Sequence, residues 1–272
     1  MILVLWDNRR KRGYFMIYIS HLLSDEDMKK AIEKYNVGVE SIEFSISENL
    51  DHLKEKIVEY RSRLERMGTS ELTVHGPFLD LNPAAYDSEI SRVTELRFAQ
   101  SYETAVELGA KKIVYHSCYY PKIYFLQGWA ERVADFMNHF LEGRTEIEVD
   151  MENVLDPKWE PVEKLAQLVE AENFGLCLDV GHANCYSEES ITDWATGLCP
   201  YIRHVHMHDN HGDRDAHMAV GKGNIPFPEI IGLLQNNRDD WKDITWTIEC
   251  QSLEDVRVSI DAIQNLKDRR KI

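Results

Sequence analysis

Short runs rich in β-branched and aromatic residues alternate along the chain with longer stretches in which apolar residues recur at helical spacing. Several short runs are apolar almost throughout, which is typical of strands buried on both faces. The pattern predicts eight strands: Tyr14–Ile19, Val39–Ser45, Glu71–His75, Lys111–His116, Glu146–Glu152, Phe174–Asp179, Ile202–His206 and Ile244–Glu249. Eight strands separated by about as many helices favour a (β/α)₈ barrel, with a doubly wound sheet as the alternative.

The helical stretches carry recognisable start signals. Amphipathic spacing predicts helices over Leu50–Met67 and Ile90–Leu108. Ser24 and Ser252 are each followed three residues later by Asp, which predicts a helix N-cap at both serines. Asp156 before Pro157 predicts a third.

The chain is expected to form one domain. Its 272 residues suit a single barrel, and no linker rich in Pro, Gly or Ser interrupts the pattern. Residues 1–13 precede the first expected strand and include the basic run Arg9–Arg12. We therefore expect an N-terminal extension over 1–13 and the barrel over 14–272.

The charge balance bears on the partners. Thirty-one Lys and Arg stand against forty-seven Asp and Glu, a formal net charge of −16. That excess opposes general binding to nucleic acid or anionic membranes, although it leaves room for a local basic groove. A small-molecule partner is favoured, and the oligomeric state, including a homo-oligomer, is left open.

The cysteines and the lengths of the apolar runs indicate in which cellular compartment the protein is expected. Five cysteines form no Cys-x-x-Cys pair, so neither a disulfide framework nor a thiolate zinc site is expected. No apolar run approaches the ~20 residues of a membrane span, and the opening residues do not resemble a signal peptide. A cytoplasmic protein fits these features best.

Ionisable residues stand at the ends of six consecutive predicted strands. They are His75, His116, Glu152, Asp179, His206 and Glu249. In a parallel barrel the carboxyl ends of the strands meet at one rim, where barrel active sites are built. Six such residues in succession predict a shared site rather than six separate accidents.

Two loops contribute further ligand types. His182 follows Asp179 by three residues, and Asp215 and His217 lie in the loop after the seventh strand. Imidazole and carboxylate ligands without thiolate suit a divalent cation: Zn²⁺ or Mn²⁺ first, Co²⁺ or Mg²⁺ next. Four carboxylates on one dry rim would be costly without cations to neutralise them. No nucleotide cofactor is expected.

Several segments in chain order resemble the xylose-isomerase-like TIM-barrel superfamily, which contains sugar isomerases and epimerases and also endonuclease IV. The matching segments are Val74–Phe78, Tyr115–His116, Met151–Asn153, Leu178–His182, His204–Asp209, Asp215–His217, Val220–Ile225 and Ile248–Glu249. They span the third to eighth strands, and the ordered set is specific at superfamily level.

The resemblance implies roles at matching positions. Sugar epimerases of the superfamily hold one divalent metal through residues matching Glu152, Asp179, His206 and Glu249, and the two glutamates transfer protons on opposite faces of the substrate. Endonuclease IV holds three zinc ions. Its ligands match those four residues together with His75, His116, His182, Asp215 and His217.

Two departures from the superfamily pattern affect the choice of function. Ala216 stands between two ligand positions where endonuclease IV has a basic residue, and Lys222 replaces a common acidic residue in the Gly-x-Gly-Asn segment. Lys222 and His182 are candidate contacts for substrate hydroxyls or a phosphate. The favoured hypothesis is a metal-dependent isomerase or epimerase acting on a sugar or sugar phosphate. An endonuclease IV-like phosphoesterase is the alternative, and a non-catalytic metal- or sugar-binding barrel is the third.

Overall fold

The computed structural model describes residues 16–268, and the expected extension over 1–13 lies outside them. Eight parallel strands pair in sequence order and close into a barrel. The strands are β1 (Ile17–Ser20), β2 (Gly38–Ser41), β3 (Leu72–His75), β4 (Lys112–His116), β5 (Glu148–Glu152), β6 (Phe174–Asp179), β7 (Ile202–Met207) and β8 (Thr245–Ile248). β1 closes the ring on β8 through pairs such as Ile17 with Trp246. The (β/α)₈ single-domain prediction is confirmed, and the doubly wound alternative is wrong.

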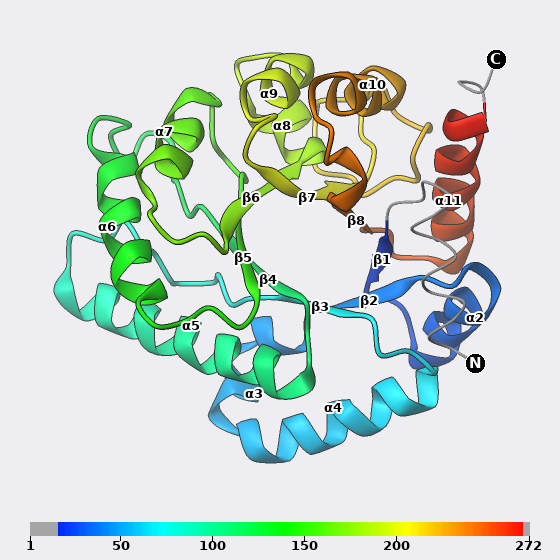
Figure 1. Cartoon of the computed structure of the whole chain (residues 1–272), viewed down its shortest axis with the longest axis horizontal. Coiled ribbons are helices and arrows are strands. Elements are labelled where there is room, and N and C mark those ends of the chain that lie inside the picture. The colour runs from blue at the N-terminus through cyan, green and yellow to red at the C-terminus, as the bar shows by residue number, and fades with distance from the viewer. Residues whose placement is uncertain (1–15, 269–272) are drawn as a thin grey trace.

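Helices surround the barrel (Figure 1). They are α2 (Asp25–Tyr35), α3 (Ser47–Asp51), α4 (Leu53–Met67), α5 (Ser88–Leu108), α6 (Trp129–Leu141), α7 (Glu160–Leu168), α8 (Val180–Tyr186), α9 (Ile191–Gly197), α10 (Phe227–Asn237) and α11 (Leu253–Asp268). Two short 3₁₀ turns, Glu43–Ser45 and Trp241–Asp243, complete the described elements. Large apolar side chains such as Trp129, Trp194 and Phe140 are fully buried in the hydrophobic core. None of the helices among residues 16–268 combines the length and the apolar run needed to cross a membrane.

The predicted strand over 39–45 ends early. β2 stops at Ser41 because serine hydroxyls form local hydrogen bonds that compete with the sheet. The Ser41 hydroxyl accepts from the Glu43 amide at 3.2 Å, and the Ser45 hydroxyl donates to the Ile42 carbonyl at 2.7 Å. The chain then turns into the 3₁₀ segment.

The expected helices are mostly present. Ser24 caps α2 and Ser252 caps α11, each accepting from the amide three residues on. The predicted helix 50–67 is divided into α3 and α4 at His52, whose φ of −122° and ψ of 35° are not helical. The cap predicted at Asp156 is wrong. Its carboxylate accepts from the Ser117 hydroxyl at 2.6 Å and the Val154 amide at 2.9 Å, and α7 begins at Glu160.

The barrel interior is unusually polar. Barrel interiors are usually filled by Val, Ile and Leu. Here Glu40, Thr73, Lys112, Asp150 and His204 are all buried. Contacts between non-adjacent strands, such as Glu40 on β2 with His204 on β7 at 3.1 Å, place these side chains in the interior. Polar and charged side chains, rather than hydrocarbon ones, therefore fill the barrel directly beneath the candidate metal ligands at the rim.

Candidate metal centre

The structure brings the six strand-end residues together at the carboxyl rim. Glu152 lies at the centre of the cluster and is 1% exposed. Its Oε2 is 3.4 Å from His75 Nε2, 3.5 Å from His116 Nε2 and 3.4 Å from His206 Nδ1. Its Oε1 is 3.1 Å from His182 Nδ1. One carboxylate thus faces four imidazoles from four different parts of the chain.

His206 connects this carboxylate to two others. Its Nδ1 is 3.8 Å from Asp179 Oδ2 and 3.6 Å from Glu249 Oε1. The three carboxylates come from the ends of β5, β6 and β8, and the imidazole comes from β7. One imidazole and three carboxylates converging on a point is a donor set that divalent cations accept.

The loop after β7 completes the cluster. Asp215 Oδ2 is 3.0 Å from His217 Nε2 and 3.5 Å from His182 Nε2. His217 Nδ1 donates to the Glu249 carbonyl at 3.0 Å, which fixes its ring over the rim. All nine sequence-predicted ligand residues therefore form one continuous set of contacts.

Asp209 anchors this loop. Its carboxylate accepts from the amides of Gly221, Gly223 and Ile225 at 2.8–3.2 Å. A Cβ on Gly223 would lie 2.1 Å from the Asn210 carbonyl oxygen, so the turn requires glycine there. Hydrogen bonds to the buried Asp209 carboxylate thus hold the ends of the segment that carries Asp215 and His217.

Sequence reasoning did not include two residues that contact the cluster, His208 at the rim and Glu40 below it. His208 Nε2 lies 3.2 Å from Asp179, its Nδ1 lies 3.3 Å from Asp215 Oδ1, and its ring stacks on His217 at 4.0 Å. Strand alternation could have found it, because His208 continues the series of His204 and His206 on one face. Glu40 Oε1 is 3.0 Å from His206 Nε2. The sequence offered one indication that Glu40 matters: it is a glutamate inside a short strand that is predicted to be buried.

Several buried ligand atoms have no well-aligned hydrogen-bond partner. They are Glu152 Oε2, both ring nitrogens of His206, His208 Nδ1, Asp215 Oδ1 and, below them, Glu40 Oε1. Nearly all buried polar atoms in proteins are hydrogen-bonded, and a place for an ion is one recognised reason for an exception. Unpaired imidazole and carboxylate atoms that point toward one another fit a divalent cation.

The electrostatics agree with this fit. Burial would raise the pKa of Glu152, but His206 and His116 outweigh it and hold that pKa well below its usual range. Burial would lower the pKa of His206, but the surrounding anions, Glu40 and Glu152 among them, raise it well above its usual value. Burial lowers the pKa of His116 to about 3. The His116 ring is thus neutral, whereas a protonated His206 helps to balance the carboxylates, and a bound cation would displace its proton.

The loop ligands show the same pairing. Burial would lower the pKa of His217, but its hydrogen bond to Asp215 and the charge of Glu249 raise it to about 9. Hydrogen bonds from His182 and His217 overcome burial and lower the pKa of Asp215.

Lys222 is set apart from the cluster. It lies on an exposed turn, and its backbone amide donates to the Ala219 carbonyl at 3.0 Å. Within residues 16–268, no described side-chain contact joins its ammonium group to the ligand residues. Its predicted contact with substrate stays a prediction.

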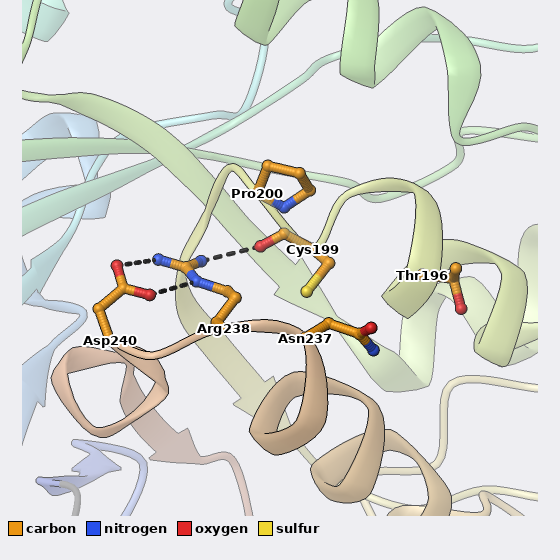
Figure 2. A pocket seen from close by; sticks show the side chains of 6 residues that line it. All are labelled: Thr196, Cys199, Pro200, Asn237, Arg238 and Asp240. Atoms are coloured by element: carbon orange, nitrogen blue, oxygen red, sulfur yellow. Dashed lines mark hydrogen bonds and ion pairs between the residues drawn. The ribbon is translucent and has the colours of Figure 1, made fainter.

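A pocket of about 450 Å³ lies on the other side of the barrel, at the amino ends of β7 and β8. Figure 2 shows its Arg238 guanidinium directed at Asp240 and at the Cys199 carbonyl. These contacts measure 2.6 Å and 2.9 Å. The arginine is already neutralised, so this pocket offers no free charge comparable to the rim.

The family model for the xylose isomerase-like TIM barrel matches residues 26–268. The chain belongs to this family. A curated relative, the uncharacterized protein MJ1311 of Methanocaldococcus jannaschii, is 28% identical over 206 residues, covering 70% of this chain and 69% of the relative.

Two solved structures share the fold. A D-tagatose 3-epimerase-like protein superposes with a TM-score of 0.75 at 23% identity, covering 93% of this chain and 97% of the other. The TTHB071 protein of Thermus thermophilus, soaked with ZnCl₂, gives a TM-score of 0.75 at 22% identity, covering 93% and 98%. The family and fold expectations are confirmed, and at these identities the solved structures show the fold alone.

Proposed function

We propose that this protein is a divalent-metal-dependent isomerase or epimerase acting on a sugar or sugar phosphate. The observation that carries the proposal is the set of three carboxylates, Glu152, Asp179 and Glu249, within 3.4–3.8 Å of the unpaired His206 Nδ1. The similarity to a sugar epimerase-like structure supports the substrate class. The net charge of −16 favours a small substrate over nucleic acid.

Zinc or manganese fits the donor set best. A divalent cation held by Glu152, Asp179, His206 and Glu249 would polarise a substrate carbonyl and make the neighbouring C–H group more acidic. Glu152 and Glu249 enter from β5 and from the residue after β8. One of them removes the proton from carbon, and the other returns a proton from the opposite face or to the adjacent carbon.

Other residues of the cluster would bind the substrate. His182 and His75 are nearly buried beside Glu152 and can donate to substrate hydroxyls. Lys222, on its exposed turn, would meet a terminal phosphate if the loop closed over a sugar phosphate. Comparing wild type with Lys222→Ala on a ketose and its phosphate tests this role, since only the phosphorylated substrate should lose affinity.

The decisive experiment follows hydrogen exchange at carbon. Protein loaded with Mn²⁺ or Zn²⁺ is incubated with ketohexoses and their phosphates in D₂O, and deuterium on carbon is read by NMR and mass spectrometry. We expect deuterium incorporation for at least one substrate. Glu249→Gln keeps a carbonyl oxygen for the metal but removes the base, so with saturating metal it should lower the rate by roughly 10²–10⁴-fold. Absence of exchange from all substrates would contradict the proposal.

An endonuclease IV-like phosphoesterase is the second candidate, and the extent of the ligand set favours it. Besides the His206 site, further groups each bring potential ligand atoms within 4.8 Å, among them His75 with His116 and Glu152, and His208 with Asp215 and His217. Metal analysis of protein purified without chelator distinguishes the candidates. Two or three tightly bound zinc ions, with hydrolysis of small phosphate esters or abasic DNA, would favour the phosphoesterase, whereas one exchangeable ion favours proton transfer.

A non-catalytic metal- or sugar-binding barrel is the third interpretation. It predicts metal binding without deuterium exchange or phosphoester hydrolysis. It also predicts that Glu249→Gln alters no turnover because there is none.

A further inference from the structure

Glu40 is a fully buried carboxylate inside the barrel, below the rim cluster. It lies on β2, whereas the residues it faces lie on β3, β7 and β8. Its described contacts within residues 16–268 include no Lys or Arg, so imidazoles and hydroxyls hold this buried negative charge. A group so costly to bury calls for a specific role.

The two oxygens of Glu40 have different partners. The hydroxyls of Thr73 and Thr247 donate to Oε2 at 3.0 Å and 2.8 Å, and His204 Nε2 lies 3.1 Å from the same oxygen. Oε1 is left facing His206 Nε2 at 3.0 Å. Contacts from three strands therefore fix the plane of the carboxylate and direct one oxygen at His206.

The two ring nitrogens of His206 also have different partners. Nε2 faces Glu40, while Nδ1 faces Glu152 at 3.4 Å and Glu249 at 3.6 Å. An imidazole can bind a cation only through a nitrogen without hydrogen, and a carboxylate on the other nitrogen holds the hydrogen there. We propose that Glu40 is a positioning residue that keeps the hydrogen on His206 Nε2 and so presents Nδ1 to the metal. The inference rests on the proposed metal centre.

The geometry favours positioning over direct ligation by Glu40. Oxygen and nitrogen atoms of Glu40, His206 and Glu249 do lie within 4.8 Å of one another. His206 Nε2 nevertheless lies 3.0 Å from Glu40 Oε1 and Nδ1 lies 3.4 Å from Glu152 Oε2, close enough for a small ring rotation to align the Nε2 hydrogen with Glu40. One ring cannot offer both nitrogens to the same ion. Glu40 therefore acts through the ring.

The first test is Glu40→Gln. Because Thr73 and Thr247 donate to one oxygen, the glutamine would keep its carbonyl there and turn its NH₂ toward His206 Nε2. That arrangement favours hydrogen on Nδ1, the wrong nitrogen. We expect zinc affinity of the metal-free protein, measured by chelator competition, to fall about 10–100-fold. The matched control is Glu43→Gln, whose carboxylate pairs with Arg63 at 2.7 Å and should leave zinc affinity unchanged.

A spectroscopic readout separates positioning from a merely structural effect. Long-range ¹H–¹⁵N NMR of zinc-loaded wild type should show His206 bound through Nδ1 with hydrogen on Nε2. Thr247→Val removes one hydroxyl from Glu40 Oε2 with little change of shape. Thr247→Val should lower zinc affinity less than Glu40→Gln does. If Glu40→Gln does not fold, Thr247→Val alone tests the role of Glu40.

The outcomes are distinguishable. Wild-type zinc affinity in both Glu40→Gln and Thr247→Val, or ligation through Nε2 in wild type, would overturn the role of Glu40 while leaving the metal centre intact. If wild type takes up neither zinc nor manganese, the metal centre and the role of Glu40 fall together.

Discussion

Buried charges occupy both ends of the barrel interior, but they are balanced in different ways. Lys112, 2% exposed, lies near the amino ends of the strands, 3.0 Å from Asp150 and 2.8 Å from Glu148. The carboxylates at the opposite rim are paired only with histidines in the described contacts. A lysine is a permanent counter-ion, whereas a histidine can release its proton. The amino end thus has a fixed balance of charge, whereas the donor set at the rim is suited to exchanging its protons for a cation.

Removing the permanent counter-ion should have the largest effect. Lys112→Met leaves Asp150 and Glu148 without their cation, and breaking a buried pair in this way costs about 3–5 kcal/mol. We expect urea denaturation of metal-free protein to show a loss of that size. Lys164→Met is the control, because that lysine is half-exposed beside Glu131 and should cost less than about 1 kcal/mol. Equal losses would contradict the comparison.

Adding a divalent cation should stabilise the rim. With free zinc at 100 times its dissociation constant, the unfolding free energy should rise by about 2.7 kcal/mol. Thermal melts of wild type with zinc and with EDTA measure the gain. His206→Ala, which removes the central imidazole, should lose most of it at the same zinc concentration. If zinc stabilises His206→Ala as much as wild type, the zinc binds elsewhere.

Gly181 tests how tightly His208 belongs to the rim. A Cβ on Gly181 would lie 1.9 Å from His208 Cε1, so Gly181→Ala must displace that ring. We expect a loss of about 1–3 kcal/mol in unfolding free energy. In the double variant Gly181→Ala/His208→Ala the clash is gone, so its loss should be smaller than the sum of the single losses. Strict additivity would show that the ring is free to move.

Asp156, behind the rim, should give the smallest effect. Burial raises its pKa to about 6 despite the hydrogen bond from Ser117. The stability contributed by the neutral carboxyl is present in full below the unfolded pKa of about 3.9 and is lost as pH rises through about 6. Between pH 5 and 7 wild type should therefore lose about 1 kcal/mol relative to Asp156→Asn. Paired denaturation curves measure this difference, and parallel pH profiles would contradict the assignment.

Periodicity and residue type favoured the barrel over a doubly wound sheet and predicted the six strand-end residues, and the family resemblance implied the full set of nine. His75 and Asp179 each end a largely apolar strand, and closure of a parallel barrel brings such strand ends to the same rim as Glu152. Glu40 could not be predicted in this way, because its importance depends on which residues of β7 it faces across the interior. The early end of β2 depends on two serine hydroxyls whose hydrogen bonds periodicity does not register.

The closure of β1 on β8 also sets when the centre can exist. Ile17 pairs with Trp246, so the ring has two open edges until the last strand has been synthesised. Glu249, which faces His206 and His217, follows that strand directly. A ribosome-bound chain that ends before this point has most of the donor atoms but lacks one wall of the centre. In the proposed metal centre, full-strength cation binding therefore requires β8 and Glu249, and uptake of the ion would report that the ring has closed.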